Sequence, residues 1–296
     1  MSENYTESST NGLPYFTVHL FLTGDEGSGF HIKNNRSDPW QRRQVIQRSG
    51  AVQIRCDCLD VVHGKFSPDI NSAFASLVIL KFRFDQRRQA RRIHTADIKL
   101  EFGSISPGGM RPEVHAISLD GQFSLVQTTQ TEEIHKEGEF EVGGTGLPGP
   151  TVKTNWKWGK TTQGQTEDAT TVVGSIDLLG ETAGEPNCAS WTLLENETQK
   201  TGVPEALQVG ILLKRVAPEP FQCIVEIEAQ ADFKTRLEGL FGSTPKDDPV
   251  LFRPDIAPTS NLMQYDTKTL GTLDMELKPF CDVTVNTFRG DGNKNC

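Results

Sequence analysis

Apolar and charged residues alternate in two stretches of the chain that lie on either side of a run of arginines. The first stretch runs from Leu80 to Phe84 and the second from Ile98 to Phe102. Because side chains on a β-strand point alternately to opposite faces, the apolar residues of both stretches share one face and the charged residues the other. We therefore predict a β-hairpin whose apolar face nucleates the core and whose tip carries the arginines.

Other short stretches are rich in β-branched and aromatic residues or alternate in the same way. They predict further strands at residues 15–21, 51–58, 114–119, 122–126, 152–158, 170–178, 190–194, 207–214, 221–228, 272–277 and 283–288. Asp120 and Gly121, between two of these strands, are typical of a type I′ hairpin turn. Residues 216–220 include two prolines and predict the turn of another long hairpin, which joins residues 207–214 to residues 221–228.

Two segments carry helix signals. Asp38 is a suitable N-cap and Gly50 a suitable end residue, so residues 39–49 predict a short helix. Residues 232–241 predict a second one, because their apolar residues recur at helical spacing between a capping aspartate and a glycine. Many short strands with one or two short helices predict an all-β fold, namely a β-sandwich built mostly of antiparallel hairpins.

Composition divides the chain into five parts. Residues 1–14 are polar and predict a disordered leader, whereas residues 143–150 are rich in glycine and proline and predict a linker. Residues 15–142 and residues 151–288, on the two sides of this linker, are each expected to form a β-sandwich domain or one half of a larger sandwich. Residues 289–296 predict a frayed tail.

Charge and cysteine content restrict the class of protein. The chain has 296 residues and a formal net charge of −9 at pH 7, which argues against nucleic-acid binding because such binding needs clustered cations. The polar N-terminus lacks the features of a secretory signal, and the longest apolar runs are too short to cross a bilayer. Six scattered cysteines predict free thiols in a reducing compartment. We therefore expect a cytoplasmic protein without a transmembrane segment.

Two short motifs resemble known sites but lack the context that those sites need. Residues 144–149 match G-x-G-x-x-G, but prolines occupy the place where the helix of a dinucleotide site begins, so we interpret them as linker. Cys56 and Cys58 share a strand face, but no second ligand pair completes a zinc site, and we interpret both as core residues. No cofactor and no metal are expected. Glu195 and Asn196 do not stand out from other polar residues.

Four arginines and a neighbouring histidine are the strongest candidates for a binding site, namely Arg87, Arg88, Arg91, Arg92 and His94. Guanidinium groups on one exposed loop bind phosphate, anionic lipid or an acidic partner through paired hydrogen bonds. The alternative, which we favour, is a solvated turn whose charges protect a sheet edge from aggregation. We interpret His94 as a partly exposed loop residue.

Trp156 and Trp158 lie two residues apart and therefore share one face of a predicted strand. They are candidates for the wall of an apolar pocket, although packing in the core is the more frequent role of such side chains. A pocket of this kind is what a cofactor-free enzyme requires.

Three segments resemble uncharacterised cytosolic proteins of filamentous fungi, namely residues 166–176, 190–196 and 241–254. The likeness extends over most of residues 110–290. It implies an intracellular β-rich protein with a specialised rather than a housekeeping role, and it implies no catalytic residue and no activity.

Abundant strand and turn signals without a catalytic constellation favour a non-catalytic binding protein, whose β-sandwich recognises a small molecule or a protein partner through its loops. The alternative is a cofactor-free enzyme, such as a cyclase or isomerase of specialised metabolism, that acts through a shaped apolar pocket and leaves no sequence motif. A third hypothesis, which is not favoured, is association with an anionic membrane surface through the arginine loop.

Overall fold

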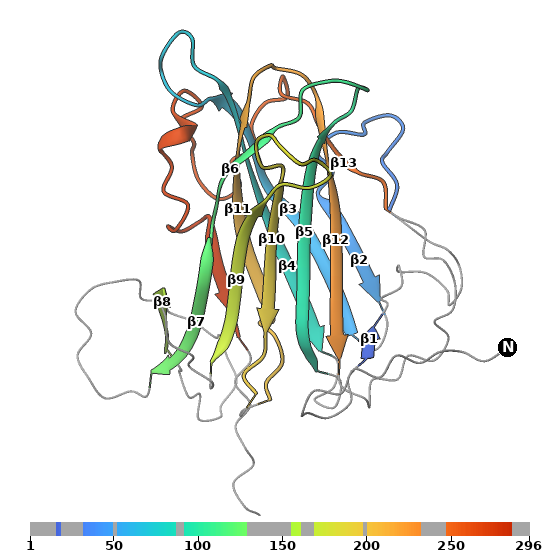
Figure 1. Ribbon diagram of the computed structural model, residues 1–296, viewed down its shortest axis with the longest axis vertical. Coiled ribbons are helices and arrows are strands. Elements are labelled where there is room, and N and C mark those ends of the chain that lie inside the picture. The colour runs from blue at the N-terminus through green and yellow to red at the C-terminus, as the bar shows by residue number, and fades with distance from the viewer. Residues whose placement is uncertain are drawn as a thin grey trace, which may run out of the picture.

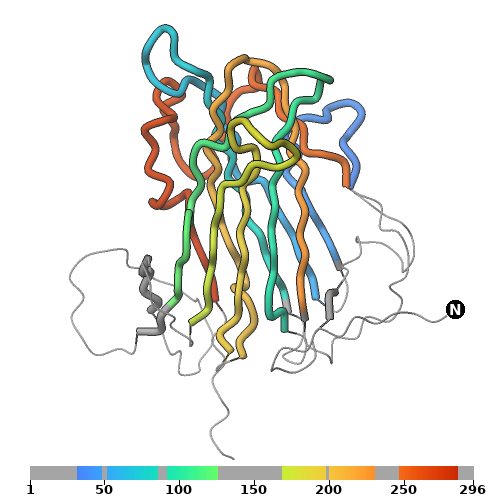
Figure 2. Tube along the Cα trace, viewed as in Figure 1, coloured from blue at the N-terminus to red at the C-terminus, as the bar shows by residue number. Residues whose placement is uncertain are grey.

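The computed structural model describes residues 16–18, 32–49, 52–86, 92–128, 155–160, 169–197, 200–231 and 247–285. They form two antiparallel β-sheets that lie face to face, as Figures 1 and 2 show. Among the described residues the one helical element is a short 3-10 turn, η1 (Leu270–Thr272). The predicted all-β fold is therefore confirmed.

Sheet A has eight strands. In spatial order they are β1 (Phe16–Val18), β12 (Phe221–Ala231), β5 (Ile93–Ser104), β10 (Cys188–Leu194), β9 (Thr170–Asp177), β7 (Gly121–Thr128) and β8 (Asn155–Lys160), with β13 (Val250–Phe252) also paired to β12. Sheet B has six. They are β14 (Cys281–Thr284), β11 (Ala206–Arg215), β4 (Phe74–Gln86), β3 (Val52–Lys65) and β2 (Gln44–Ser49), with β6 (Glu113–Ile117) also paired to β11.

The core lies between the two sheets. The six apolar residues whose alternation predicted a shared face are all buried there, namely Leu80, Phe82, Phe84, Ile98, Leu100 and Phe102. The predicted hairpin between them is wrong, because β4 belongs to sheet B and β5 to sheet A. The two strands present their apolar faces to each other across the core.

The other two predicted hairpins are wrong for the same reason. β6 pairs with β11 in sheet B while β7 pairs with β8 and β9 in sheet A, and β11 and β12 likewise lie in different sheets. Gly121 takes a φ of 97°, a conformation that glycine adopts without strain, where the chain passes from β6 to β7. An alternating apolar pattern shows that one face of a strand is buried. It does not show whether the next strand along the chain pairs with it in the same sheet or lies across the core.

The predicted helix at residues 39–49 is also wrong. Residues 44–49 form β2, which pairs with β3 at the edge of sheet B and buries Val45 and Ile46. Arg42 lies just before β2, and its guanidinium donates hydrogen bonds to the carbonyl oxygens of Asp248 and Pro249. Tertiary pairing therefore overrides the capping signals. The second predicted helix, at residues 232–241, lies outside the described residues.

Strands from both sides of residues 143–150 mix in both sheets, since β11 lies beside β4 and β10 lies beside β5. The predicted leader (1–14), linker (143–150) and tail (289–296) lie outside the described residues. Of residues 272–277, predicted as a strand, Thr272 ends η1 and residues 273–277 form turns and irregular backbone.

A C-terminal segment, residues 256–280, covers the outer face of sheet B. Leu270, Met275 and Phe280 of this segment pack on apolar residues of β3, β4 and β11 to form a second, smaller core. Gly64 in β3 allows the close approach, because a Cβ there would collide with the Thr267 carbonyl oxygen. The Asp60 carboxylate fixes the segment by accepting hydrogen bonds from Asn261, Leu262 and Tyr265.

Connections 66–73, 105–112 and 216–220 lie at the same end of the sandwich, the upper end in Figure 1. We call it the loop end.

Candidate functional site

Only two of the five residues in the predicted arginine site are described. Arg87, Arg88 and Arg91 lie outside the described residues, whereas Arg92 and His94 both contact Glu195. His94 is partly exposed as predicted, but it lies in β5 and not in a loop. The Arg92 Nε atom lies 3.1 Å from a carboxylate oxygen of Glu195, and His94 Nδ1 is hydrogen-bonded to the other.

Glu195 is held inside this cluster. It follows β10, its side chain is buried, and it also accepts a hydrogen bond from the Gly202 backbone N–H. Burial raises the pKa of Glu195, but the hydrogen bond with His94 and the charges of His94 and Arg92 outweigh it, so that the pKa is lowered overall. Sequence reasoning missed this carboxylate, because Glu195 lies about a hundred residues from its partners.

The cysteines are core residues, as predicted for Cys56 and Cys58. Both are buried and free, as are Cys188, Cys223 and Cys281. Burial raises the pKa of Cys58 to about 12, so its thiol stays protonated at neutral pH. Within the described part of the chain, no group of three or more histidine, cysteine or acidic side chains is arranged to hold a metal ion.

The structure describes only the backbone of Trp156 and Trp158, as part of β8, so their predicted place in a pocket lies outside the described side chains.

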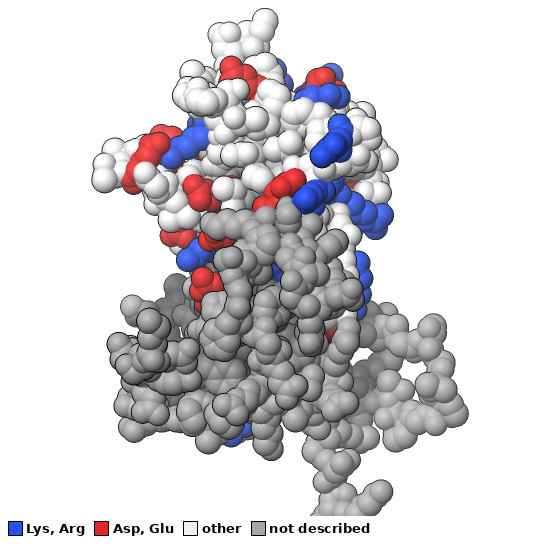
Figure 3. Space-filling view, turned by 90° about the vertical axis from the view of Figure 1, so that its right-hand side faces the viewer, with Lys and Arg blue, Asp and Glu red and all other residues white. Residues whose placement is uncertain are grey.

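Figure 3 shows basic and acidic side chains on the same face of the described surface.

The most distinctive polar group of the described core is Arg215. Alternate residues of β11 point into the sandwich, namely Val209, Ile211 and Leu213, and Arg215 continues this inward row at the loop end. It is 4% exposed. Its guanidinium carbon lies 5.7 Å from the ring centroid of Phe74 and 5.6 Å from that of Phe221, so both rings make cation–π contacts with it.

Three protein oxygens accept hydrogen bonds from the Arg215 guanidinium. Nε donates to Ser76 Oγ at 2.9 Å, one terminal nitrogen to the Ala217 carbonyl oxygen at 3.0 Å, and the other to the Ala75 carbonyl oxygen at 3.3 Å. All three acceptors are neutral, and no described carboxylate lies within ion-pair distance. Burial lowers the pKa of Arg215 to about 10, which still leaves the group charged at neutral pH.

His63 and Ser76 extend this polar cluster. The Ser76 hydroxyl lies 2.7 Å from His63 Nδ1, and His63 Nε2 lies 2.7 Å from the Gln41 amide. Because the Gln41 amide nitrogen is a donor, the neutral ring accepts at Nε2 and carries its proton on Nδ1. Nδ1 donates this proton to Ser76 Oγ, which then accepts from both His63 and Arg215. Burial and the charge of Arg215 lower the pKa of His63 to about 3, so the ring is neutral.

This serine–histidine pair does not have the properties of a nucleophile and its base. A ring whose pKa is about 3 is a weak base at neutral pH, and Ser76 is fully buried. The orienting partner of the histidine is an amide, not the carboxylate of a catalytic triad. The pair therefore serves to satisfy and position Arg215.

The buried neutral His63 predicts a loss of stability in acid. Its pKa is about 3 in the folded protein against 6.5 in the unfolded chain, so the unfolded state binds the extra proton between these values. The contribution of the neutral His63 ring to the free energy of unfolding is complete above pH 6.5 and decreases by on the order of 4 kcal/mol as the pH falls towards 3. Urea unfolding at several pH values should show this slope in the wild-type protein, and His63→Gln should flatten it. The same pH dependence of the free energy of unfolding in the two proteins would contradict the low pKa of His63.

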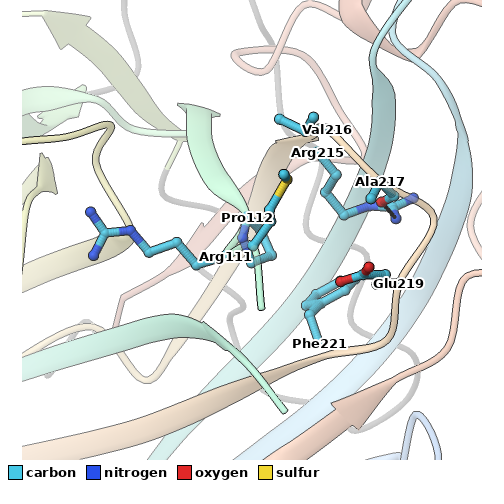
Figure 4. A pocket seen from close by; sticks show the side chains of 8 residues that line it. Arg111, Pro112, Arg215, Val216, Ala217, Glu219 and Phe221 are labelled. Carbon is cyan, nitrogen blue, oxygen red and sulfur yellow. Dashed lines mark hydrogen bonds between the residues drawn. The ribbon is translucent and has the colours of Figure 1, made fainter. Parts of the chain in front are cut away.

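A small pocket opens beside Arg215 at the loop end (Figure 4). Its volume is about 10 Å³, which is room for roughly one water-sized group. The lining residues are Met110, Arg111, Pro112, Arg215, Val216, Ala217, Glu219 and Phe221. Met110 and Val216 on its rim are 61% and 74% exposed.

A second, wide hollow of about 640 Å³ lies over residues 180–183. Among the described residues one surface loop lines it, and the ionisable side chain of that loop, Glu181, is paired with Arg111 at 3.1 Å. These described residues do not enclose a ligand, so we place the candidate site at the Arg215 pocket.

Comparison of the chain with family models, curated proteins and solved structures gives no match. The resemblance to proteins of filamentous fungi therefore stays a prediction.

In the described part of the chain, no helix has the length and apolar character needed to span a membrane.

Proposed function

We propose that this protein is a non-catalytic binding protein, whose β-sandwich recognises a small molecule or a protein partner at the loop end. The observation that carries the proposal is Arg215, a buried cation whose hydrogen-bond acceptors are all neutral, beside a pocket with an exposed apolar rim. A buried charge without an opposite charge is costly to the folded state, and a ligand that supplies the opposite charge offsets that cost.

The packing of the sandwich supports binding over catalysis. Side chains from both sheets, including Phe82, Phe102 and Trp191, fill the space between them. A cyclase or isomerase that works by shape alone requires an apolar pocket of roughly 300 Å³ or more. The pocket beside Arg215 is far smaller, and a ligand there would bind by one end with most of its body outside.

Two further features support a cytoplasmic location and argue against the arginine loop as a membrane anchor. The five described cysteines are free thiols, as is usual in a reducing compartment. Arg92, at the end of the arginine run, contacts the carboxylate of Glu195, which reduces the positive charge available to a lipid surface.

The proposal is tested by measuring the melting temperature of the protein with a chemically diverse set of small molecules. Compounds that bind the loop end should raise the melting temperature of the wild type and of Leu277→Asp, but not that of Met110→Asp. Both variants replace an exposed apolar side chain by aspartate, and only Met110 lines the pocket.

Mass spectrometry of each binding compound after long incubation completes the test. Unchanged compounds support a non-catalytic role. Conversion of a compound by the protein would overturn it, and stabilisation that survives in Met110→Asp would place binding elsewhere.

A further inference from the structure

The chemistry of the Arg215 pocket restricts what kind of ligand it accepts, an argument that rests on the proposed function. Arg215 carries a full positive charge, and its three hydrogen bonds to Ser76, Ala217 and Ala75 leave some of its N–H donors unused. Its Nε and one terminal nitrogen bind strand β4, which fixes the plane of the group. A fixed guanidinium with spare donors favours an oxyanion over a neutral group.

The size of the pocket limits how much of a ligand enters. About 10 Å³ accommodates one oxygen atom or a group of similar size. The remainder of the ligand must lie over the rim, where Met110 and Val216 expose apolar surface. The ligand that matches both features has a small anionic end and an apolar body.

The acidic residue in the lining limits the charge of the anion. Glu219 lines the same pocket, and Figure 4 shows it on the same side as Phe221, near Arg215. The Arg111 side chain points away from Arg215 in this view and is paired with Glu181, so it adds little positive charge to the pocket. One cation and one nearby carboxylate favour a monoanion over a phosphate dianion, which Glu219 repels.

We propose that the Arg215 pocket binds the carboxylate of a small apolar monocarboxylic acid. One carboxylate oxygen accepts hydrogen bonds from unused N–H groups of Arg215, and the apolar chain lies on Met110 and Val216. Phe221, whose ring contacts the guanidinium, forms the inner wall.

The proposal is tested by calorimetric titration with three probes of the same chain length, namely octanoate, octanamide and octyl phosphate. Octanoate should bind in the millimolar range or tighter. Octanamide, which lacks the charge, and octyl phosphate as a dianion should each bind about tenfold more weakly or not at all.

Two matched variants locate the site. Val216→Asp places a negative charge on the rim and should weaken octanoate binding about tenfold. Ile70→Asp makes the same kind of exchange at a 92% exposed position that does not line the pocket, and should leave binding unchanged. Glu219→Gln should tighten octanoate binding by removing the repulsion. Arg215→Gln should abolish binding, and the surface variants keep the test decisive if Arg215→Gln does not fold.

The outcomes separate this inference from the proposed function. Octanamide binding as tightly as octanoate, with both weakened by Val216→Asp, would overturn the carboxylate assignment and leave the loop end as a binding site. Octanoate binding that Val216→Asp and Glu219→Gln leave unchanged would place the octanoate site elsewhere and overturn the carboxylate assignment, while the Met110→Asp comparison still tests the loop end. Absence of octanoate binding to the wild type would overturn the carboxylate assignment alone, since the diverse compound set tests the loop end independently.

Discussion

Phe82→Asp is expected to leave the protein unfolded or aggregated. Phe82 is fully buried in β4, a central strand of sheet B, between Cys56 of β3 and Leu207 of β11. Removing the ring costs about 3–5 kcal/mol, and burying an unpaired carboxylate costs several kcal/mol more. The sum is comparable to the whole stability of a typical domain, about 5–15 kcal/mol.

The neighbouring residue supplies the control. Arg83 is on the opposite face of β4 with a side chain that is 46% exposed, and Arg83→Asp should change the free energy of unfolding by less than about 1 kcal/mol. Circular dichroism and urea unfolding of the two variants give the comparison. A soluble, cooperatively folded Phe82→Asp protein would show that the assigned inward face of β4 is wrong.

Asp60→Ala is expected to release the C-terminal segment and to destabilise the protein by about 3–5 kcal/mol. Asp60 is fully buried, and its two oxygens accept hydrogen bonds from the backbone N–H groups of Asn261 and Leu262, the Asn261 amide and the Tyr265 hydroxyl. Alanine leaves these donors without an acceptor beneath a segment that covers the second core. Limited proteolysis should cut residues 256–280 faster in this variant than in the wild type.

Tyr265→Phe is the graded control for Asp60→Ala. It removes only the hydroxyl that donates to Asp60 at 2.7 Å and should cost about 1 kcal/mol in urea unfolding. Similar losses in the two variants would mean that Asp60 does not anchor the segment through several bonds at once.

The faces of the strands could be predicted from the sequence, but their partners could not. Alternation correctly assigned Leu80, Phe82, Ile98 and Leu100 to the core, because each of these strands turns one face towards the opposite sheet. The same pattern arises whether the next strand pairs in the same sheet or lies across the core. After β4, β6 and β11 the next strand lies in the opposite sheet, and all three predicted hairpins are wrong for that reason.

The candidate site was only partly accessible to sequence reasoning. The inward row of β11 extends by period two from Val209 to Arg215, so an arginine at the end of a buried face was a usable signal. His63 offered no such signal. A bulge between Cys58 and Asp60 shifts the period, and His63 points into the sandwich where strict alternation from Cys56 would turn it outward.

An NMR titration with octanoate tests most directly whether the loop end is the binding site. We predict saturable changes in amide chemical shift at residues 104–112 and 215–221, with smaller changes at Ser76, and no comparable changes on the outer faces of the sheets or around Glu195. Saturable shifts centred on any other surface, or none at these residues, would contradict the proposed carboxylate site at the loop end.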